Sequence, residues 1–452
     1  MARAKEKPKT FQSPRGAHDI LPEDQRLWDK VRDSLRAISN FYGFERIDTP
    51  HFEDTELFYV GVGRATDIVS KQLYSFKTRG GDMLTLRPEG TAPIARAYVE
   101  HGMAAWPQPV KLYYLGSFFR HESPQRGRFR EFRQWGLELL GDEGAAADAQ
   151  IIQVFYIFLR EWGLGDSAVE VNSIGCSLCR PSYRSQLVQY YRSRVRGLCR
   201  DCKERFRENP LRLLDCAQEK CVMVKKSAPQ ILDKLCDPCR AHFKALLEFL
   251  EESAVPYVLN PRLVRGLDYY TRTVFETFIE DQSKPAVVDA ASGSEDKGKA
   301  EPAEAAKKLA IVSGGRYDNL IELVGGRPTP AVGGAMGLER LISIIKKREA
   351  KIPLTARPKV FLAQLGELAK KKSFGLMEEL RKAGITAAES LGRDSIRSQL
   401  KIADRRGAEY TLIVGQKEAL DQMVIIREML SGTQEAIPQS KLIETLKRKL
   451  RK

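Results

Sequence analysis

Residues 112–141 constrain the fold of this chain more than any other segment, because their alternating polarity predicts two antiparallel strands joined by a charged loop. On the second strand Trp135, Leu137 and Leu139 point to one face, which suits a buried core. The opposite face offers an aromatic ring, an amide and a carboxylate, from Phe132, Gln134 and Glu138. A hairpin with a solvated outer face explains the same pattern equally well, so the segment alone predicts a sheet rather than a site.

The length of 452 residues exceeds one compact core, so we expect two or three domains. The formal net charge of +15 attracts polyanions and makes RNA or DNA the leading class of partner, although a basic surface also serves solubility. Neither the basic N-terminal stretch nor any later segment has the apolar length of a signal peptide or a membrane span. We therefore expect a soluble cytoplasmic protein without a membrane partner.

The apolar pattern predicts a core in two parts, residues 11–171 and 243–349. Within it we expect a helix over residues 24–42, where apolar side chains recur at helical spacing after an acidic start. A strand is expected at residues 83–86 and a helix at residues 91–101. Helices and strands thus both contribute to the core.

Other segments differ from this core in composition. Residues 172–242 are helical in pattern and carry all eight cysteines, so they are predicted to be an insertion. Residues 281–308 consist largely of Ala, Lys, Glu and Ser and offer little to bury, which predicts a disordered loop. A linker at residues 350–358 precedes residues 359–452, whose alternating strands and helices predict a small α/β domain with a mostly parallel sheet. Its 19 basic and 12 acidic residues fit a nucleic-acid partner or a solvated surface.

Polar side chains beside glycines mark four further segments, residues 86–91, 263–273, 314–318 and 331–340. Glu89 and Thr91 suit an ammonium group, and Arg340 in the first turn of a predicted helix suits a phosphate. Alone, each segment also fits an exposed ion pair or a turn. Together with Arg120 and Arg265 they predict a ligand that carries an ammonium, a carboxylate and a polyphosphate. Such arginines offset charge on a phosphoryl group without a protein nucleophile.

In this order, the segments resemble the class II aminoacyl-tRNA synthetases and, among them, the histidyl-tRNA synthetase family. The similar segments are residues 120–138 for class motif 2, 332–341 for motif 3, 21–50 for the looser motif 1, and 263–276 and 314–320 for two motifs of the histidine family. The resemblance implies an α+β catalytic core on an antiparallel sheet, a helical insertion and a C-terminal anticodon-binding domain of α/β type. It also implies a cytoplasmic homodimer that is a ligase: with ATP and magnesium it forms histidyl-adenylate and passes histidine to its tRNA, which residues 123–130 would approach.

The resemblance also implies a role for each matching residue. Histidine's ammonium group would be held by Glu89, Thr91 and Gln134, and its imidazole nitrogens by Glu138 and Tyr270, with Tyr269 and Tyr317 nearby. Arg265 would be catalytic near the α-phosphate and the carboxylate, and Arg120 would bind the α-phosphate. Phe132 would stack on adenine, Glu122 would lie near adenine or the metal, and Arg340 would meet the terminal phosphate. An imidazole offers one donor and one acceptor, so a site that satisfies both rejects isosteres that lack them.

The cysteines are paired in sequence as Cys176 and Cys179, Cys199 and Cys202, Cys216 and Cys221, and Cys236 and Cys239. Their spacing provides enough thiolates for two tetrahedral structural zinc sites. Reduced, inert cysteines on helices are the alternative. A disulfide scaffold is not expected in a chain of this size.

Two other functions remain to be weighed against the ligase. One is a catalytically silent paralogue, similar to the regulatory subunit of ATP phosphoribosyltransferase, and the other is an RNA-binding module that keeps the synthetase shape. The first lacks an anticodon domain and tends to lose the arginine that is Arg265 here, and the second would show loss of Glu89, Arg120, Arg265 or Arg340. All four residues are present, which favours the enzyme.

Overall fold

The structure is a computed structural model that describes residues 11–64, 66–122, 128–280, 308–348, 359–392 and 395–450. The predicted disordered loop, apart from its last residue, and the predicted linker at 350–358 lie outside the described residues, as do residues 123–127 of the motif 2 loop. No helix among the described residues has the length and apolar character to cross a membrane.

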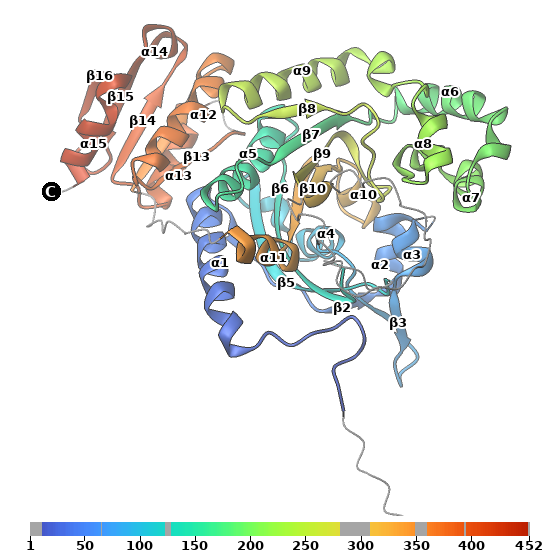
Figure 1. Cartoon of the computed structure of the whole chain (residues 1–452). Helices are drawn as coiled ribbons and strands as arrows, with labels where there is room; N and C mark the ends of the chain where they lie inside the picture. The colour runs from blue at the N-terminus through green and yellow to red at the C-terminus, as the bar shows by residue number, and fades with distance from the viewer. Residues whose placement is uncertain are drawn as a thin grey trace, which may run out of the picture.

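An eight-stranded sheet forms the centre of the molecule, with the strand order β1-β5-β6-β11-β10-β9-β7-β8 (Figure 1). Its strands are β1 (Glu45–Arg46), β5 (Val110–Phe119), β6 (Glu131–Leu140), β7 (Ala168–Ser173), β8 (Tyr257–Leu259), β9 (Thr271–Glu280), β10 (Lys308–Arg316) and β11 (Ala331–Gly337). The inner pairs are antiparallel, and the outermost pairs at both edges are parallel. The predicted hairpin at residues 112–141 is confirmed, as is the α+β core on an antiparallel sheet.

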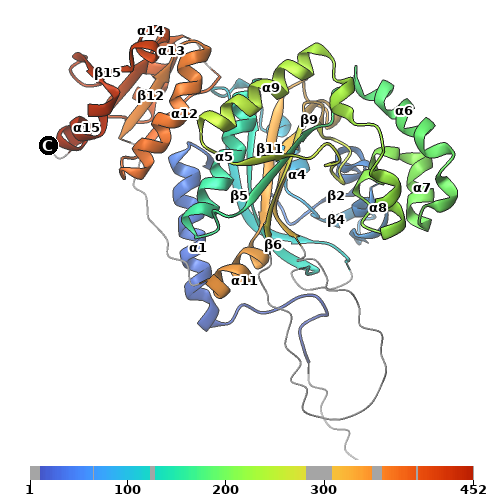
Figure 2. The same cartoon turned by 45° about the horizontal axis from the view of Figure 1, so that its top comes forward.

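Helices pack on one face of this sheet around the largest apolar core (Figure 2). They are α1 (Pro22–Phe41), α5 (Ala145–Glu161), α9 (Asp237–Glu252) and α11 (Leu338–Arg348). In α1 the side chains of Val31, Leu35 and Ile38 are buried at helical spacing, as the sequence predicts. On the sheet side, Trp135 and Leu137 of β6 are fully buried in the same core. The alternation of β6 therefore has the predicted sense.

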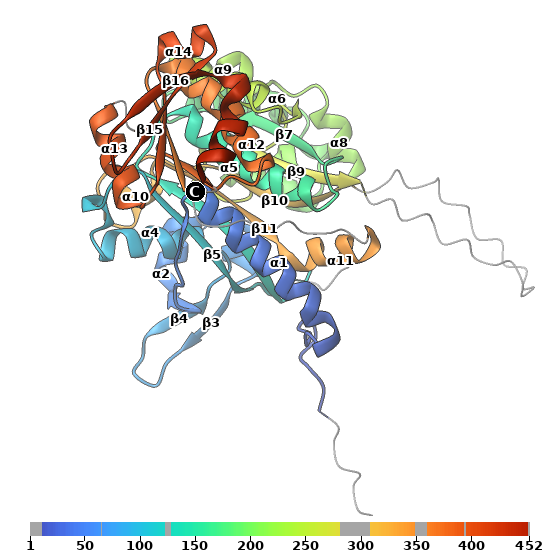
Figure 3. The ribbon, with the colours of Figure 1, turned by 90° about the vertical axis from the view of Figure 1, so that its left-hand side faces the viewer.

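The opposite side of the sheet is covered by α4 (Thr91–Glu100) and α10 (Leu320–Leu323). A three-stranded sheet in the order β2-β4-β3 lies beside them, and its β3–β4 hairpin projects from the body in Figure 3. This sheet and its neighbouring helices comprise β2 (Phe52–Asp54), β3 (Tyr74–Lys77), β4 (Met83–Leu86), α2 (Thr55–Phe58), η1 (Tyr59–Gly63) and α3 (Asp67–Lys71); η2 (Met103–Ala105) follows α4. The strand predicted at residues 83–86 and the helix predicted from Thr91 are confirmed.

All the cysteines belong to the segment that starts after β7 and rejoins the core at α9. Within this cysteine-bearing segment, defined here as residues 174–239, the elements are short: α6 (Arg180–Arg192), η3 (Val195–Gly197), α7 (Arg200–Glu208), η4 (Pro210–Asp215), α8 (Glu219–Lys225) and η5 (Ile231–Lys234). It lies at the opposite end of the molecule from the C-terminal part of the chain (Figure 1).

The C-terminal part has its own five-stranded sheet in the order β13-β12-β14-β15-β16. Its elements are β12 (Val360–Gln364), α12 (Glu367–Lys382), β13 (Ala387–Glu389), α13 (Ile396–Arg405), β14 (Tyr410–Val414), α14 (Gln416–Asp421), β15 (Met423–Glu428), β16 (Gln434–Pro438), η6 (Gln439–Lys441) and α15 (Leu442–Leu450). The expectation of a mostly parallel sheet was wrong, because only β13, β12 and β14 run parallel and the next two pairs are antiparallel. A short turn joins β15 to β16, and so short a connection permits only an antiparallel pair.

Candidate active site

A cavity of about 400 Å³ lies over the antiparallel sheet, on the side of α4. Ten of the predicted site residues line it: Glu89, Thr91, Arg120, Glu122, Phe132, Gln134, Arg265, Tyr269, Tyr270 and Arg340. The remaining two, Glu138 and Tyr317, lie behind the cavity wall. Glu138 contacts Thr91 directly, and Tyr317 contacts Glu138. Residues up to 251 positions apart in the chain (340 − 89) thus meet in one place.

A buried carboxylate, that of Glu138, is held by two hydroxyl donors. Thr91 Oγ1 donates to Glu138 Oε1 at 2.7 Å, and Tyr317 Oη donates to Oε2 at 2.5 Å. Burial raises the pKa of Glu138 to about 8, although the two hydrogen bonds oppose that shift. At neutral pH the protonated form of this carboxyl is therefore favoured.

The second buried carboxylate, Glu89, lies just before the first turn of α4. It accepts hydrogen bonds from the backbone N–H groups of Thr91 at 2.7 Å and Ala92 at 2.9 Å, groups that a helix N-terminus leaves without intrahelical partners. Burial raises the pKa of Glu89, and these hydrogen bonds counteract the shift. The helix thereby fixes Glu89 at the cavity wall.

Two buried polar atoms of the cavity lack a hydrogen-bond partner within the described residues: Gln134 Oε1 and Arg265 Nε. Unpaired buried polar atoms are costly, and natural proteins keep them where a ligand or water completes them. Gln134 offers an acceptor and Arg265 a donor. Both predicted positions therefore have hydrogen-bonding capacity left for a ligand.

Glycines make room for the larger groups of the site. A Cβ atom at Gly136 or at Gly90 would overlap the ring of Tyr114, and one at Gly333 would overlap the carboxylate of Glu138. Gly333 pairs with Glu138 across β11 and β6, so the carboxylate lies over the neighbouring strand. The glycine gaps noted in the sequence thus coincide with close side-chain packing.

The three arginines approach the cavity from separate elements. Arg120 donates from Nε to Pro88 O at 2.8 Å, and its guanidinium lies 5.2 Å from the ring centre of Phe132. Arg265 Nη1 lies 2.6 Å from Glu276 Oε1, and this carboxylate raises the pKa of Arg265 despite its burial. Arg340 Nη1 donates to Ala310 O at 2.6 Å. Each guanidinium is therefore oriented by the protein before any ligand arrives.

The tyrosines form an aromatic corner between the two ends of the site. The ring centres of Tyr269 and Tyr270 are 4.6 Å apart, and those of Tyr269 and Tyr317 are 5.7 Å apart. Burial raises the pKa of all three phenols, so they remain neutral donors and acceptors.

Sequence reasoning missed several residues of this cavity. Glu276 and Ser313, which hydrogen bond to one another at 2.9 Å, lie on adjacent strands. The period of two along β9 places Glu276 on the same face as Val274, so alternation could have identified it. Arg212 and Asp215 of η4 also line the cavity, but they come from the cysteine-bearing segment, and nothing in the sequence connects them to the site.

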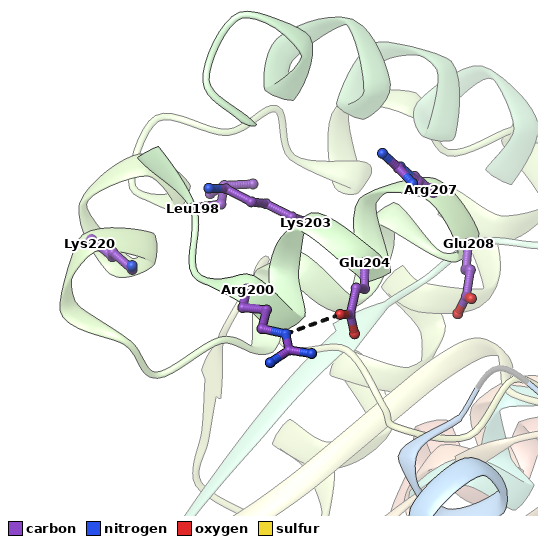
Figure 4. Close-up of a pocket in the computed structure, with 7 residues that line it drawn as sticks. All are labelled: Leu198, Arg200, Lys203, Glu204, Arg207, Glu208 and Lys220. Carbon is purple, nitrogen blue, oxygen red and sulfur yellow. Dashed lines mark ion pairs between the residues drawn. The ribbon is translucent and has the colours of Figure 1, made fainter. Parts of the chain in front are cut away.

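A second cavity, of about 570 Å³, lies on the exposed side of α7 (Figure 4). Its charged lining includes Arg200, Lys203 and Glu204, and Arg200 pairs with Glu204 at 3.5 Å with 92% of the arginine side chain exposed. Figure 4 shows Arg200 and Glu204 close together on α7, joined by their ion pair. Exposed pairs of this kind contribute little energy, and none of the predicted site residues lies here.

The eight cysteines form two clusters of four. Cluster A contains Cys176, Cys179, Cys236 and Cys239, and cluster B contains Cys199, Cys202, Cys216 and Cys221; in each, all Sγ atoms lie within 4.8 Å of one another. Measured Sγ–Sγ distances are 3.7–3.9 Å in cluster A and 3.8 Å between Cys199 and Cys216 in cluster B. Tetrahedral zinc with Zn–S bonds of about 2.3 Å has S–S edges of about 3.8 Å. The donor sets therefore fit zinc.

Backbone N–H groups point at several of these sulfur atoms. Cys176 N lies 3.1 Å from Cys179 Sγ, and Cys199 N lies 3.3 Å from Cys221 Sγ. Such donors stabilise thiolates and orient metal ligands. All eight cysteines, each within the described residues, are unpaired thiols in this structure.

An antiparallel sheet that gathers arginines and buried carboxylates around one cavity, with sequence motifs 1 to 3 placed along it, defines a class II aminoacyl-tRNA synthetase. A family model described as histidyl-tRNA synthetase matches residues 16–291, and one described as an anticodon binding domain matches residues 359–449. The chain belongs to the histidyl-tRNA synthetase family.

Curated relatives cover nearly the whole chain. A histidine–tRNA ligase of Dehalococcoides mccartyi is 46% identical over 97% of this chain and all of the relative. A histidine–tRNA ligase of Caldicellulosiruptor saccharolyticus is 42% identical over the same shares. Among solved structures, the apo histidyl-tRNA synthetase of S. aureus is 31% identical, covers 96% of this chain and 99% of its own, and superposes with a TM-score of 0.59.

Proposed function

We propose that this protein is a histidine–tRNA ligase, which activates L-histidine with ATP to histidyl-adenylate and diphosphate and then transfers histidine to its tRNA. The observation that carries the proposal is the convergence of Arg120, Arg265 and Arg340 on the same cavity as the Glu89 and Thr91 end of α4. Arginines, carboxylates and an amide that meet in one cavity match a nucleotide lying beside an amino acid.

Histidine recognition divides between the two ends of the amino acid. Its ammonium group binds Glu89, Thr91 and the unpaired Gln134 Oε1, which supply acceptor oxygens around one point of the cavity. Its imidazole nitrogens bind Glu138 and Tyr270, while Tyr269 and Tyr317 pack around the ring. A site that pairs both nitrogens leaves buried polar groups unsatisfied when an apolar analogue binds, and this produces strong discrimination.

ATP occupies the basic side of the cavity. Phe132 stacks on adenine, and Arg120, whose guanidinium lies 5.2 Å from the ring centre of Phe132, binds the α-phosphate. Arg340 meets the terminal phosphate, and Glu122 lies near adenine or the magnesium that accompanies ATP. The carboxylate of Glu122 lies 3.6 Å from Arg128 and 4.0 Å from Arg120, so it is available to a cation only in competition with these arginines.

Activation needs no protein nucleophile. A carboxylate oxygen of histidine attacks the α-phosphorus, the bond to the bridging oxygen of the β-phosphate breaks, and diphosphate leaves with that electron pair. Arg265 and Arg120 stabilise the charge that develops on the α-phosphoryl oxygens. In the second step a ribose hydroxyl of the tRNA attacks the activated carbonyl, and AMP leaves.

The tRNA contacts more than the catalytic cavity. Residues 359–452 form the anticodon-binding domain, and residues 123–130 approach the acceptor stem. The net charge of +15 favours binding of such a polyanion. The protein functions in the cytoplasm as a homodimer.

Histidine-dependent exchange between diphosphate and ATP tests this function. Exchange with histidine, and none with an isosteric amino acid that lacks the ring nitrogens, is the expected result. Absence of exchange from folded protein would leave the silent paralogue or the RNA-binding module. Sedimentation of the same sample tests the homodimer.

The two cysteine clusters hold structural zinc in this proposal. Their Sγ–Sγ spacing and their N–H donors are the supporting observations. Metal analysis of protein purified without chelators should give two zinc ions per chain. A folded, metal-free protein whose eight thiols all react with a thiol reagent would contradict this.

A further inference from the structure

Cluster B differs from cluster A in what it adjoins. Its ligand Cys216 directly follows η4, and η4 contributes Arg212 and Asp215 to the catalytic cavity. Cys199 and Cys202 lie at the start of α7, which precedes η4. In the chain, the four cysteines of cluster B therefore lie on both sides of η4, and η4 forms part of the active site.

Charged contacts join this segment to the catalytic core. Arg205 of α7 and Arg212 of η4 both donate to Asp67 Oδ2, at 2.6 and 2.5 Å. Asn209, between them, donates to Asp268 Oδ1 at 2.9 Å. Asp67 begins α3 and itself lines the cavity, so the contacts reach the site directly.

Three kinds of contact hold the C-terminal end of η4 (Pro210–Asp215). Leu213 and Leu214 of η4 are buried in an apolar core together with Cys202 and Cys216, whereas the preceding α7 buries only Cys202 among its residues. Lys225 Nζ donates to Leu214 O at 3.0 Å and to Cys216 O at 2.8 Å. Cluster B therefore lies directly beside the end of η4, where Asp215 meets the cavity.

Cluster A has a different environment. Its cysteines lie between β7 and α6 and at the start of α9, where the segment leaves and rejoins the core. Next to it, Arg180 Nη2 donates to Tyr270 O at 2.6 Å, and Gly175 O accepts from Arg272 N at 2.9 Å. Cluster A therefore brings together the two ends of the cysteine-bearing segment.

We propose that a thiophilic divalent metal, zinc, bound by Cys199, Cys202, Cys216 and Cys221 positions η4, so that Arg212 and Asp215 complete the wall of the catalytic cavity beside Arg265. Loading of cluster B then governs substrate binding and turnover, through Asp67 and its two arginines. Cys216, Asp67 and Arg212 are positioning residues in this scheme. The inference rests on the proposed function only for its activity measurement.

The key variants are Cys216→Ser, which removes a ligand, and Cys216→His, which replaces it with another zinc ligand. We expect one zinc per chain in C216S and two in C216H and in the wild type. In C216S, amide hydrogen exchange should accelerate in residues 199–216 and in α3 but not in β5 and β6. Its kcat/KM for diphosphate exchange should fall about tenfold to a hundredfold, because small displacements of site residues are costly, and C216H should restore it.

Two further variants separate positioning from folding. Asp67→Ala removes the oxygens that accept from Arg205 and Arg212 without touching a sulfur atom, so it should keep two zinc ions and reproduce the loss of kcat/KM. Arg200→Ala, on the exposed face of α7, should change none of the readouts.

The proposal is overturned if C216S loses its zinc yet keeps kcat/KM within twofold of the wild type, or if α3 keeps its protection in that variant. It is also overturned if the wild type binds no metal at cluster B. Failure of the ligase function has a separate signature, because the wild type would then show no exchange while its metal content and hydrogen exchange still report on the cluster.

Discussion

The phenol of Tyr317 donates to the carboxylate of Glu138 at 2.5 Å, and both side chains are almost completely buried. Across the same carboxylate, Thr91 occupies the other oxygen. Glu138 therefore has both oxygens engaged by hydroxyl groups of the protein, which fixes the plane of its carboxyl group. In the proposed function, this arrangement makes the histidine end of the site rigid before the substrate binds.

Removing the phenolic hydroxyl should weaken histidine binding. In Tyr317→Phe one of the two hydroxyl partners of Glu138 is lost, and leaving a buried polar group without its partner costs about 1–3 kcal/mol. We expect the KM for histidine to rise about tenfold, with little change in the KM for ATP, in the diphosphate exchange assay. Tyr257→Phe, which loses an exposed hydrogen bond to Glu251, should behave as the wild type.

The raised pKa of Glu138 predicts a pH-dependent stability. The folded protein binds this proton with a pKa of about 8, against an ordinary value of 4.5, so the folded state holds more protons between those values. The stabilising contribution of this bound proton to folding is therefore fully present below about pH 4.5 and is lost as the pH rises towards 8. Its upper bound in the free energy of unfolding is about 5 kcal/mol, since each unit of pKa difference corresponds to about 1.36 kcal/mol.

The variant Glu138→Gln removes this titration and keeps the shape. Its unfolding midpoint relative to the wild type should therefore rise steadily between pH 5 and pH 8 in thermal denaturation. Glu56→Gln, at an exposed ion pair with Arg64, should show a constant difference over the same range. A constant difference for E138Q as well would mean that the carboxyl is already ionised at low pH.

Much of this site follows from the period of two along one strand. Phe132, Gln134 and Glu138 face the cavity or its wall and Trp135 faces the largest apolar core, because successive side chains of a strand alternate between the two faces of the sheet. Gly136 lies between Gln134 and Glu138 on the same strand, and its lack of a side chain leaves room for the ring of Tyr114. Local pattern and tertiary packing agree here.

Other features depend on contacts that no local pattern encodes. Arg212 enters the cavity only because the cysteine-bearing segment folds back onto α3. Similarly, the spacing of the cysteines predicts two zinc sites but not which cysteines belong to each site, because Cys176 lies beside Cys236 from the far end of the segment. The antiparallel edge of the C-terminal sheet was not predicted, because an alternation of strands and helices is also the pattern of a parallel sheet, and the directions of β15 and β16 depend on how they pair.

Loss of the guanidinium of Arg265 should mainly slow the chemical step. Because Glu276 holds it at 2.6 Å, the cation is preoriented, and such groups typically contribute about a hundredfold to a thousandfold to kcat. We expect Arg265→Gln to reduce kcat for exchange by that factor with a smaller change in the KM for ATP. Arg262→Gln removes an exposed arginine close by in the chain and should leave kcat unchanged.

A buried ion network beneath the sheet predicts the largest loss of stability. Asp148 accepts hydrogen bonds from Arg316, His242 and Thr273, and the side chains of Asp148 and Arg316 have no exposed surface. Arg316, more than any other group, holds the pKa of Asp148 below its ordinary value despite burial, so its stabilising contribution is present at neutral pH and is lost as the pH falls.

In Asp148→Asn the buried guanidinium loses its counter-charge, and breaking such a pair costs about 3–5 kcal/mol. We expect a clear fall in the thermal midpoint at pH 7 and a smaller difference from the wild type in acid, where the carboxylate is titrated. Asp166→Asn disrupts a half-exposed pair with Arg348 and should cost at most about 1 kcal/mol. Equal midpoints for D148N and D166N would show that the charge of Asp148 is not needed for stability, although the amide keeps only one of the two acceptor oxygens that Arg316, His242 and Thr273 use.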